Sequence, residues 1–377
     1  MYVPKELCRG MAAALLLAGA GCSPRSGDRA DSGQIETAGS ANNSMAEAPA
    51  SAAAPNQQMQ AVLTELTALN PKPIPQLSAA EARKQPTPAD AVKALLEKQG
   101  KSTAPEPVGN VTNRMIPGAG GPIPIRIYTP KGSGPFPVVV YYHGGGWVIA
   151  DLNTYDASPR ALANLVNAVV VSAHYRQGPE HKFPAAHQDA FAAYRWVLTN
   201  AKSLKGDPAK VAVVGESAGG NLAAAVSMMA RDSGAQMPVH QVLVYPIAGY
   251  DLNTPSYQEN AEAKPLNKAM MGWFFEQYLR SPADGKNPLI DLVHANVQKF
   301  PGTTVIAAQI DPLRSEGKAL ADRLKDAGIE VDYKNYDGAA HEFFGMGAVL
   351  DDAKEAQQQA AAGLQKGFGA SRTASAQ

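Results

Sequence analysis

The chain has 377 residues, 45% of them hydrophobic, which is enough for one large α/β domain with a sizeable buried core. Lysine plus arginine and aspartate plus glutamate both number 34, so the formal net charge is zero. This balance provides no overall field to recruit nucleic acid or an anionic surface, and it favours a neutral small-molecule substrate.

Residues 1–21 are predicted to be a signal peptide, because a basic start precedes an apolar run, Met11 to Ala20, that is too short to span a bilayer. Cys22 then resembles the lipidated cysteine of bacterial lipoproteins, although Gly19 stands where leucine is usual. Residues 18–20 offer an ordinary cleavage site as the alternative. We expect an exported lipoprotein that meets the membrane only through Cys22 and faces the periplasm or exterior, or else a soluble exported protein.

Residues 22–56 are predicted to form a disordered tether, because they are rich in small and polar residues and almost lack large apolar ones. The only cysteines are Cys8 and Cys22. The folded part, residues 57–369, is therefore expected to hold no disulfide, no cysteine-based metal site and no thiol nucleophile.

Two helices are predicted ahead of the sheet. Apolar residues recur at helical spacing from Gln58 to Asn70, and a second helix starts with the capping pattern of Thr87 and runs to about Gln99. Together with an insertion at 248–289, they are expected to form a helical cap over about 57–105 and 248–289. The aromatic and methionine cluster at 270–278 fits either core packing or the lining of a substrate cleft.

Short apolar strands alternate with helices along the rest of the chain, and residues 370–377 are left as a tail. This alternation predicts an α/β fold with an eight-stranded, mostly parallel, doubly wound sheet, in which the first two strands form an antiparallel edge. The predicted strands are 108–115, 123–128, 138–142, 169–173, 211–214, 242–245, 304–308 and 331–336, and the helices are 158–166, 185–200, 217–231, 315–327 and 351–368.

Ser217 is the candidate nucleophile. It lies in Gly215-Glu216-Ser217-Ala218-Gly219-Gly220, directly after a β-branched run and before a helix, which is the pattern of a nucleophile elbow. A serine hydroxyl is a poor nucleophile at neutral pH and needs an adjacent base that an acid orients. In such elbows the partners follow in the order serine, acid, histidine.

His341 is the candidate base, because it lies in a loop directly after the last predicted strand. His240 and His294 also follow Ser217, but His240 begins a strand and His294 has almost no acid ahead of it at a strand end. A surface or capping role suits His240 better.

Asp311 is the candidate acid, since it follows a strand at the carboxyl edge where open α/β sheets build their sites. A turn or helix-capping role is its structural alternative. Asp291 and Asp337 are the competing acids, and Asp337 lies too close to His341 along the chain to orient it from behind.

An oxyanion hole is predicted at His143-Gly144-Gly145-Gly146-Trp147, directly after a strand. The missing side chains let backbone N–H groups approach a substrate oxygen, and the N–H of Ala218 would complete the hole.

With these residues placed, the chain resembles the hormone-sensitive lipase family of α/β-hydrolases, especially its bacterial esterases, from about Gln58 to the last helix. The motifs that carry the resemblance are HGGGW at 143–147, GESAGG at 215–220, DPLRSEG at 311–317, HEFF at 341–344 and a tyrosine-arginine turn at 175–180.

The resemblance implies a triad of Ser217, Asp311 and His341. Gly145, Gly146 and Ala218 would supply the oxyanion N–H groups, Gly144 would complete the turn, and His143, Arg176 and Glu180 would brace the site. Glu216 stands where aspartate is commoner and Tyr155 where the family often has histidine. The expected substrate-pocket residues are Trp147, Tyr155, Phe343 and Phe344.

These patterns predict a serine carboxylic-ester hydrolase that works through an acyl-enzyme without metal or organic cofactor. The resemblance implies short to medium acyl esters. An amidase, peptidase or sugar deacetylase on the same triad is the alternative within enzymes. A non-catalytic ligand receptor of this fold, or a structural envelope lipoprotein, fits less well because all three triad residues are present.

Overall fold

The computed structural model describes residues 53–369. The predicted signal peptide, Cys22, the predicted tether up to residue 52 and the predicted tail from residue 370 lie outside this range. Within residues 53–369, no helix combines the length and the hydrophobicity that a bilayer crossing needs.

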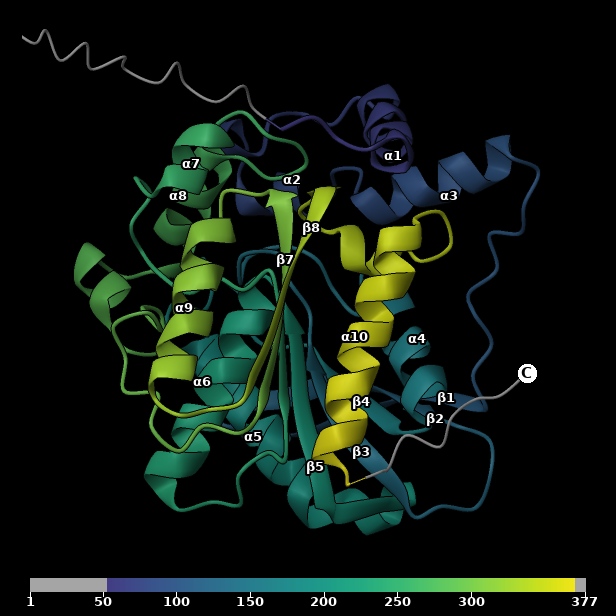
Figure 1. The fold of residues 1–377 in the computed structure, drawn as a ribbon, viewed down its shortest axis with the longest axis vertical. Coiled ribbons are helices and arrows are strands. Elements are labelled where there is room, and N and C mark those ends of the chain that lie inside the picture. The colour runs from purple at the N-terminus through teal and green to yellow at the C-terminus, as the bar shows by residue number, and fades with distance from the viewer. Residues whose placement is uncertain (1–52, 370–377) are drawn as a thin grey trace, which may run out of the picture. The chain divides into compact units, whose positions relative to one another are not determined.

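A single eight-stranded sheet forms the centre of the described part, as predicted (Figure 1). The strand order is β1-β2-β4-β3-β5-β6-β7-β8. β2 pairs antiparallel with both β1 and β4, and all the pairs from β4 across to β8 are parallel. Each predicted strand overlaps an observed one. The strands are β1 (Asn110–Gly118), β2 (Gly121–Thr129), β3 (Phe136–Tyr142), β4 (Val169–Ala173), β5 (Gly206–Glu216), β6 (Gln241–Val244), β7 (Thr303–Ile310) and β8 (Val331–Ala340).

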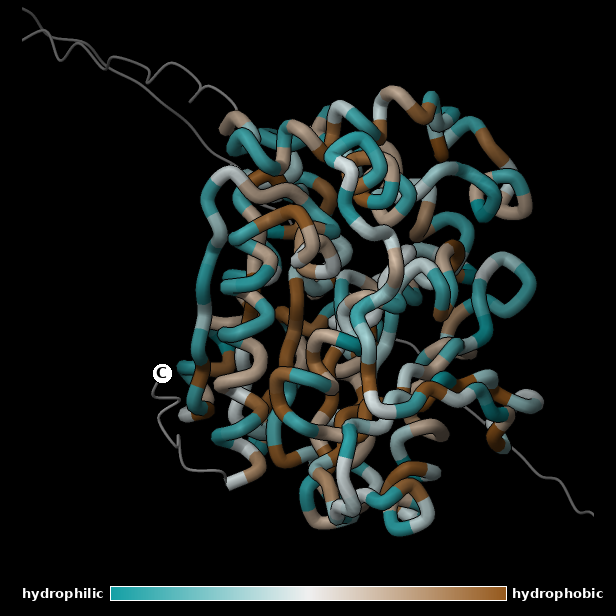
Figure 2. Tube along the Cα trace, turned by 90° about the vertical axis from the view of Figure 1, so that its right-hand side faces the viewer, coloured by the Kyte–Doolittle hydropathy of each residue, from teal (hydrophilic) through white to brown (hydrophobic). Residues whose placement is uncertain are grey.

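Helices cover both faces of the sheet. In β3, Val138 and Val140 belong to one buried core, whereas Val139 and Tyr141 belong to the other, because successive strand side chains point to opposite faces. Figure 2 shows brown hydrophobic stretches of chain in the interior of the fold. The first core includes α5 (Ala185–Asn200), α6 (Ala218–Ser233) and α9 (Arg314–Asp326), and the second includes α4 (Ala157–Val166) and α10 (Asp351–Gly367).

The remaining helices gather beyond the carboxyl ends of β7 and β8 (Figure 1). Thr87 begins α3 with a capping box to Asp90, and the Lys98 ammonium lies 2.7 Å from the Glu65 carboxylate, joining α3 to α1. These helices fall inside the two segments predicted as a cap. They are α1 (Gln57–Ala68), α2 (Ala79–Ala82), α3 (Pro88–Lys98), α7 (Pro255–Glu259) and α8 (Lys268–Tyr278).

Asn56 is bound into the fold, although the sequence placed it at the end of the tether. Its side chain accepts a hydrogen bond from the Met59 N–H at 2.9 Å and so caps α1. Its backbone N–H donates to the Gly338 carbonyl at 3.0 Å. The folded part therefore starts before the predicted boundary at residue 57.

Candidate active site

Ser217 occupies the sharp turn between β5 and α6. Its φ of 57° and ψ of −118° lie where a residue with a side chain is rarely found. The turn is closely packed, because a Cβ on Gly215 would lie 1.9 Å from the Gly219 carbonyl oxygen and a Cβ on Gly219 would lie 2.0 Å from that of Tyr142. Only glycine fits on either side of this turn, which explains the glycines of the motif.

Ser217, His341 and Asp311 form one chain of hydrogen bonds. The Ser217 Oγ lies 3.0 Å from His341 Nε2, and His341 Nδ1 lies 2.7 Å from Asp311 Oδ2. Three separate strands deliver them: β5 ends just before Ser217, β7 just before Asp311 and β8 just before His341. The parallel strands end at one edge of the sheet and bring the three side chains together there.

The local structure fixes the acid in place. Asp311 is fully buried, and its Oδ1 accepts a hydrogen bond from the Leu313 N–H at 2.9 Å while Oδ2 faces the imidazole. The bond from His341 Nδ1–H selects the tautomer whose Nε2 can accept a proton from Ser217. Asp291 instead pairs with the exposed His294, so the competing acid and histidine form a surface pair.

The charges around His341 favour its protonated form. Burial lowers the pKa of His341, but attraction and hydrogen bonding by Asp311, with further attraction by Glu342 and Glu216, raise it above the usual 6.5. A base that becomes easier to protonate in this setting suits proton transfer from a serine.

The glycine loop after β3 faces Ser217. Gly145 and Gly146 have φ values of 94° and 58°, and both line the same cavity as Ser217. A Cβ on Gly146 would lie 2.2 Å from the Phe274 ring, so glycine is required where the loop passes under the cap. Gly144 lies outside the residues that line this cavity, and its carbonyl accepts a hydrogen bond instead.

His143 holds the glycine loop from within. Its Nδ1 lies 2.8 Å from the Gly144 carbonyl oxygen, and its Nε2 lies 3.0 Å from Nδ1 of His174. Burial, followed by repulsion from His174, lowers the pKa of His143 to about 3, so the ring is neutral at pH 7. The Tyr175 hydroxyl adds a bond to the His143 carbonyl at 2.8 Å. The ring therefore serves the loop's conformation.

The turn after β4 braces the same loop. The Gly178 N–H donates to the Trp147 carbonyl at 2.9 Å, and Arg176 pairs with Asp189 on α5 at 2.7 Å. Glu180 pairs with Arg83, which follows α2 in the cap. The sequence pointed to Arg176 and Glu180, but Arg83 carried no motif and was missed.

The catalytic cavity has a volume of about 430 Å³. Its floor includes Ser217, His341, Gly145 and Gly146, and its upper walls come from residues 66–88 and 264–274. Both segments predicted as cap therefore line it.

Three of the four predicted pocket residues lie away from this cavity. Trp147 is fully buried and stacks on Tyr278, with ring centroids 4.8 Å apart. Phe343 and Phe344 are fully buried in the core that includes α4 and α10. Aromatic rings next to the motifs thus pack behind the site, and only Tyr155 lines the cavity. Met270 and Phe274, from the insertion whose role the sequence left open, line it as well.

Glu216, next to the nucleophile, points away from the substrate. It is buried, and the hydroxyls of Tyr141 and Tyr245 both donate to its carboxylate. Burial and repulsion from Glu342 raise the pKa of Glu216 to about 7, against the effect of these hydrogen bonds. Neither tyrosine was identified from the sequence.

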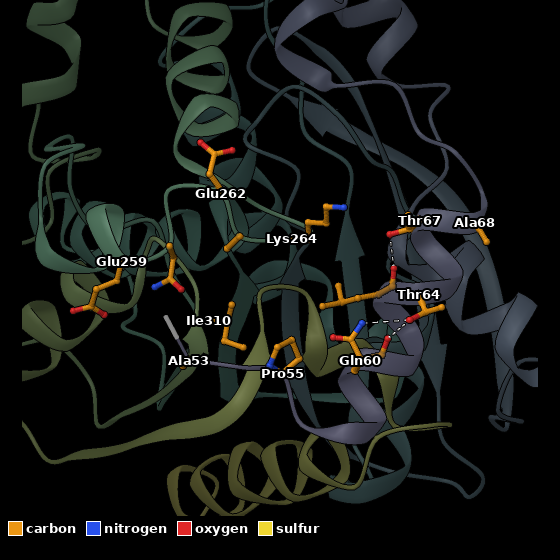
Figure 3. A pocket seen from close by; sticks show the side chains of 13 residues that line it. Ala53, Pro55, Gln60, Thr64, Thr67, Ala68, Glu259, Glu262, Lys264 and Ile310 are labelled. Atoms are coloured by element: carbon orange, nitrogen blue, oxygen red, sulfur yellow. Dashed lines mark hydrogen bonds between the residues drawn. The ribbon is translucent and has the colours of Figure 1, made fainter. Parts of the chain in front are cut away.

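The structure also has a second cavity, of about 700 Å³, whose lining residues are drawn in Figure 3. Thr67 of α1 and Lys264 line both cavities, and Figure 3 shows the Lys264 side chain extending toward α1. Glu259 and Glu262 lie at its other side. No sequence pattern indicated this cavity, because its walls come from segments far apart in the chain. Within residues 53–369, no group of three or more histidine, cysteine or acidic side chains could hold a metal ion.

An eight-stranded α/β sheet with a serine at its strand-to-helix turn, hydrogen-bonded to a histidine and an aspartate, defines the class of serine hydrolases. Known proteins narrow the class. A family profile described as alpha/beta hydrolase fold matches residues 139–345. Carboxylesterase NlhH of Mycobacterium tuberculosis is 38% identical over 249 residues, 65% of this chain and 78% of its own.

An ethyl acetate hydrolase of Pseudomonas putida is 31% identical over 288 residues, 75% of this chain and 88% of its own. Among solved structures, an esterase of Pyrobaculum calidifontis superposes with a TM-score of 0.73 at 38% identity, covering 80% of this chain and 97% of that one. The chain belongs to the hormone-sensitive-lipase-like carboxylesterase family of the α/β-hydrolase fold, and it is a serine carboxylic-ester hydrolase.

Proposed function

We propose that the enzyme cleaves esters of short to medium acyl groups through an acyl-enzyme formed on Ser217. The observation that carries this proposal is the pair of hydrogen bonds joining Ser217 Oγ to His341 Nε2 at 3.0 Å and His341 Nδ1 to Asp311 Oδ2 at 2.7 Å. These contacts lie at the floor of a cavity that both cap segments cover.

In this mechanism His341 takes the Ser217 proton as the Oγ attacks the ester carbonyl carbon, and Asp311 stabilises the imidazolium that forms. The N–H groups of Gly145, Gly146 and Ala218 receive the developing oxyanion, each contributing about 3 kcal/mol to the barrier reduction. His341 then protonates the leaving alcohol. Water repeats the sequence on the acyl-enzyme and releases the acid and free Ser217.

Cavity size and chemistry support the acyl preference. A volume of about 430 Å³ falls in the range of small-ligand pockets, and a ring and a thioether from Phe274 and Met270 provide apolar lining. The ethyl acetate hydrolase of Pseudomonas putida, a relative in this family, is named for a two-carbon acyl ester.

The test is a series of p-nitrophenyl esters of increasing acyl length, measured beside an amide of the best acyl group. We expect kcat/KM to peak at short to medium chains and the amide to be far slower. The Ser217→Ala variant should lose about 10⁴-fold or more in kcat while keeping its circular dichroism spectrum. Ser233→Ala, which removes an exposed hydroxyl at the far end of α6, is the matched control and should stay active. Full activity in Ser217→Ala would remove the assignment.

A substitution that narrows the cavity tests which acyl chain lengths it accepts. Met270→Trp should shorten the longest acyl chain accepted while leaving the shortest esters nearly unaffected, because Met270 lies in the cavity wall rather than beside the triad. If all chain lengths lost activity equally, the acyl group would not occupy this part of the cavity.

For the exported form we propose a lipoprotein, supported by the apolar run at 11–20 and by Cys22 in a lipobox-like setting. Mass spectrometry of the mature N-terminus should find lipidated Cys22 as the first residue. An unmodified Cys22, or an N-terminus at residue 21, would favour the soluble exported alternative.

A further inference from the structure

A second carboxylate lies beside the catalytic histidine. Glu342 directly follows His341 and adopts a left-handed backbone conformation, with φ of 73°. Its Oε1 lies 3.8 Å from His341 Nε2, the same nitrogen that lies 3.0 Å from Ser217 Oγ. Glu342 also lines the catalytic cavity together with Ser217. The reacting side of the imidazole therefore has an acidic neighbour that the triad does not use.

Tyr155 fixes this carboxylate. The Tyr155 hydroxyl donates to Glu342 Oε1 at 2.5 Å, and the tyrosine is only 6% exposed. Its hydroxyl packs against the glycine loop, since a Cβ on Gly144 would lie 2.3 Å from it. Tyr155 thus holds Glu342 between the oxyanion loop and the histidine. Staying there costs the glutamate side chain rotamer entropy, and the hydrogen bond from Tyr155 offsets this cost.

The groups facing His341 from the surrounding elements are acidic or neutral. Asp311 faces Nδ1 from the end of β7, and Glu342 faces Nε2 from the histidine's own loop. Tyr245, after β6, lies with its ring centroid 4.5 Å from that of the imidazole. Glu216 lies behind it, bound by Tyr141 and Tyr245. Ser217 also faces Nε2, and Tyr155 binds Glu342.

Among the three acids, only Glu342 is placed to act on the Nε2 side. Asp311 is committed to Nδ1, and Glu216 receives two tyrosine hydroxyls that keep its carboxylate turned from the cavity. The tyrosines stay neutral, because burial raises the pKa values of Tyr155 and Tyr245 well above 10.

We propose that Glu342, clamped by Tyr155, is a positioning residue that stabilises the His341 imidazolium from the side opposite Asp311. The proposal rests on the triad roles proposed above. When Nε2 takes the Ser217 proton, a positive charge appears on the ring between Asp311 and the ionised form of Glu342. Burial raises the pKa of Glu342, and the attraction of His341 and the Tyr155 hydrogen bond act against that rise. The contact at 3.8 Å is short enough for this attraction to matter in a buried site.

The Glu342→Gln variant tests this, because it keeps size and hydrogen-bonding capacity but removes the charge. Without the nearby negative charge the imidazolium is less stable and the His341 pKa falls. Catalysis requires neutral His341, so kcat/KM falls at acidic pH as this histidine becomes protonated. This acid limb of the kcat/KM profile against pH should move to lower pH by about one unit. Imidazolium forms in the transition state, so kcat on the plateau should fall by about tenfold while KM changes little.

Three further variants complete the test. Tyr155→Phe keeps the ring but loses the donor, so its acid limb should shift in the same direction by a smaller amount. Glu342→Asp restores the charge and should return the limb most of the way to that of the parent. Glu262→Gln, an exposed acid of the second cavity, makes the same change in net charge and should leave the limb in place.

An unmoved acid limb in a folded Glu342→Gln enzyme would overturn the proposal, and so would a change confined to KM, because that would indicate substrate binding. Titration of His341 by NMR in a Ser217→Ala background, with and without Glu342→Gln, measures the same shift without turnover. If Ser217→Ala alone kept the parent rate, the proposed function would fail. An essential Ser217 with an unmoved limb would remove only the role of Glu342.

Discussion

Arg83 and Glu180 form an ion pair, 2.7 Å between Nη2 and Oε2, that joins the cap to the turn beneath the glycine loop. The same guanidinium donates from Nε to the Val148 carbonyl at 2.8 Å and from Nη2 to the Gly178 carbonyl at 2.7 Å. Val148 belongs to the loop that carries Gly145 and Gly146. One cap side chain therefore satisfies two backbone carbonyls that shape the site.

Replacing Arg83 should lower stability and activity more than replacing its acidic partner Glu180. In Arg83→Met both carbonyls lose their donor, and we expect about 2 kcal/mol lower stability and about tenfold lower kcat/KM. In Glu180→Gln the carbonyl bonds remain, and the exposed ion pair contributes little. Urea unfolding and ester kinetics on both variants check this. Equal losses would mean that the ion pair, not the carbonyl bonds, holds the cap.

Asp311→Asn should lower kcat by about 10⁴-fold without unfolding the domain, because an amide in place of Oδ2 no longer selects the productive His341 tautomer. Asp337→Asn is the matched control, since Asp337 is an exposed residue of β8 and was one of the two competing acids in the sequence. The measurement is kcat for a short ester in both variants. Activity lost in Asp337→Asn and kept in Asp311→Asn would reverse the assignment.

The sequence predicted the sheet and its helices because each element carries its own local pattern. The strand 138–142 consists of valines and tyrosines, which favour strands whichever face each residue takes, and the elbow at Ser217 is a continuous motif. Ser217, Asp311 and His341 were linked by chain order and by the rule that parallel strands end at one edge. The structure places them within hydrogen-bonding distance of one another.

The sequence could not supply contacts that have no spacing rule. Arg83 meets Glu180 across 97 positions, and Tyr155 meets Glu342 across 187. Such pairs depend on how the cap and loops settle on the sheet. The same reason explains Trp147, whose ring is next to the glycine motif in sequence but turns into the core beside Tyr278.

Gly146→Ala should damage catalysis more than stability. The methyl group of this alanine would lie 2.2 Å from the Phe274 ring, and the residue would have to adopt a φ of 58°, which is unfavourable for any residue with a side chain. The loop must therefore shift away from the substrate oxygen. Loss of one oxyanion donor lowers kcat by about 10²-fold to 10³-fold. Gly272→Ala in α8, where a Cβ would have room, should keep full activity and gain about 1 kcal/mol in stability. A Gly146→Ala enzyme with the parent kcat would show that this loop does not bind the oxyanion.

The buried His187 should make the stability of the fold depend on pH. It is fully buried, with Nδ1 2.9 Å from the Tyr278 hydroxyl and Nε2 2.9 Å from Asn221 Oδ1, and burial lowers its pKa from 6.5 to about 4. Between pH 6.5 and 4 the unfolded chain binds a proton here that the folded chain does not. The stability that neutral His187 contributes is therefore complete above pH 6.5 and is lost as the pH falls toward 4.

His187→Asn should consequently be less stable than the parent at pH 7, because a shorter side chain cannot reach both partners. The difference in the free energy of unfolding between parent and variant should narrow below pH 6.5 by about 1.4 kcal/mol per pH unit, to a total of about 3 kcal/mol near pH 4. It narrows because asparagine does not titrate, so only the parent loses stability as its unfolded chain binds the proton. Urea unfolding at pH 7, 6 and 5 measures it. His294→Asn, which removes an exposed histidine and keeps His187, is the control and should lose stability toward pH 4 as the parent does. A difference that stayed constant with pH would mean that His187 has the same pKa in the folded and unfolded chains, and burial would then not lower it.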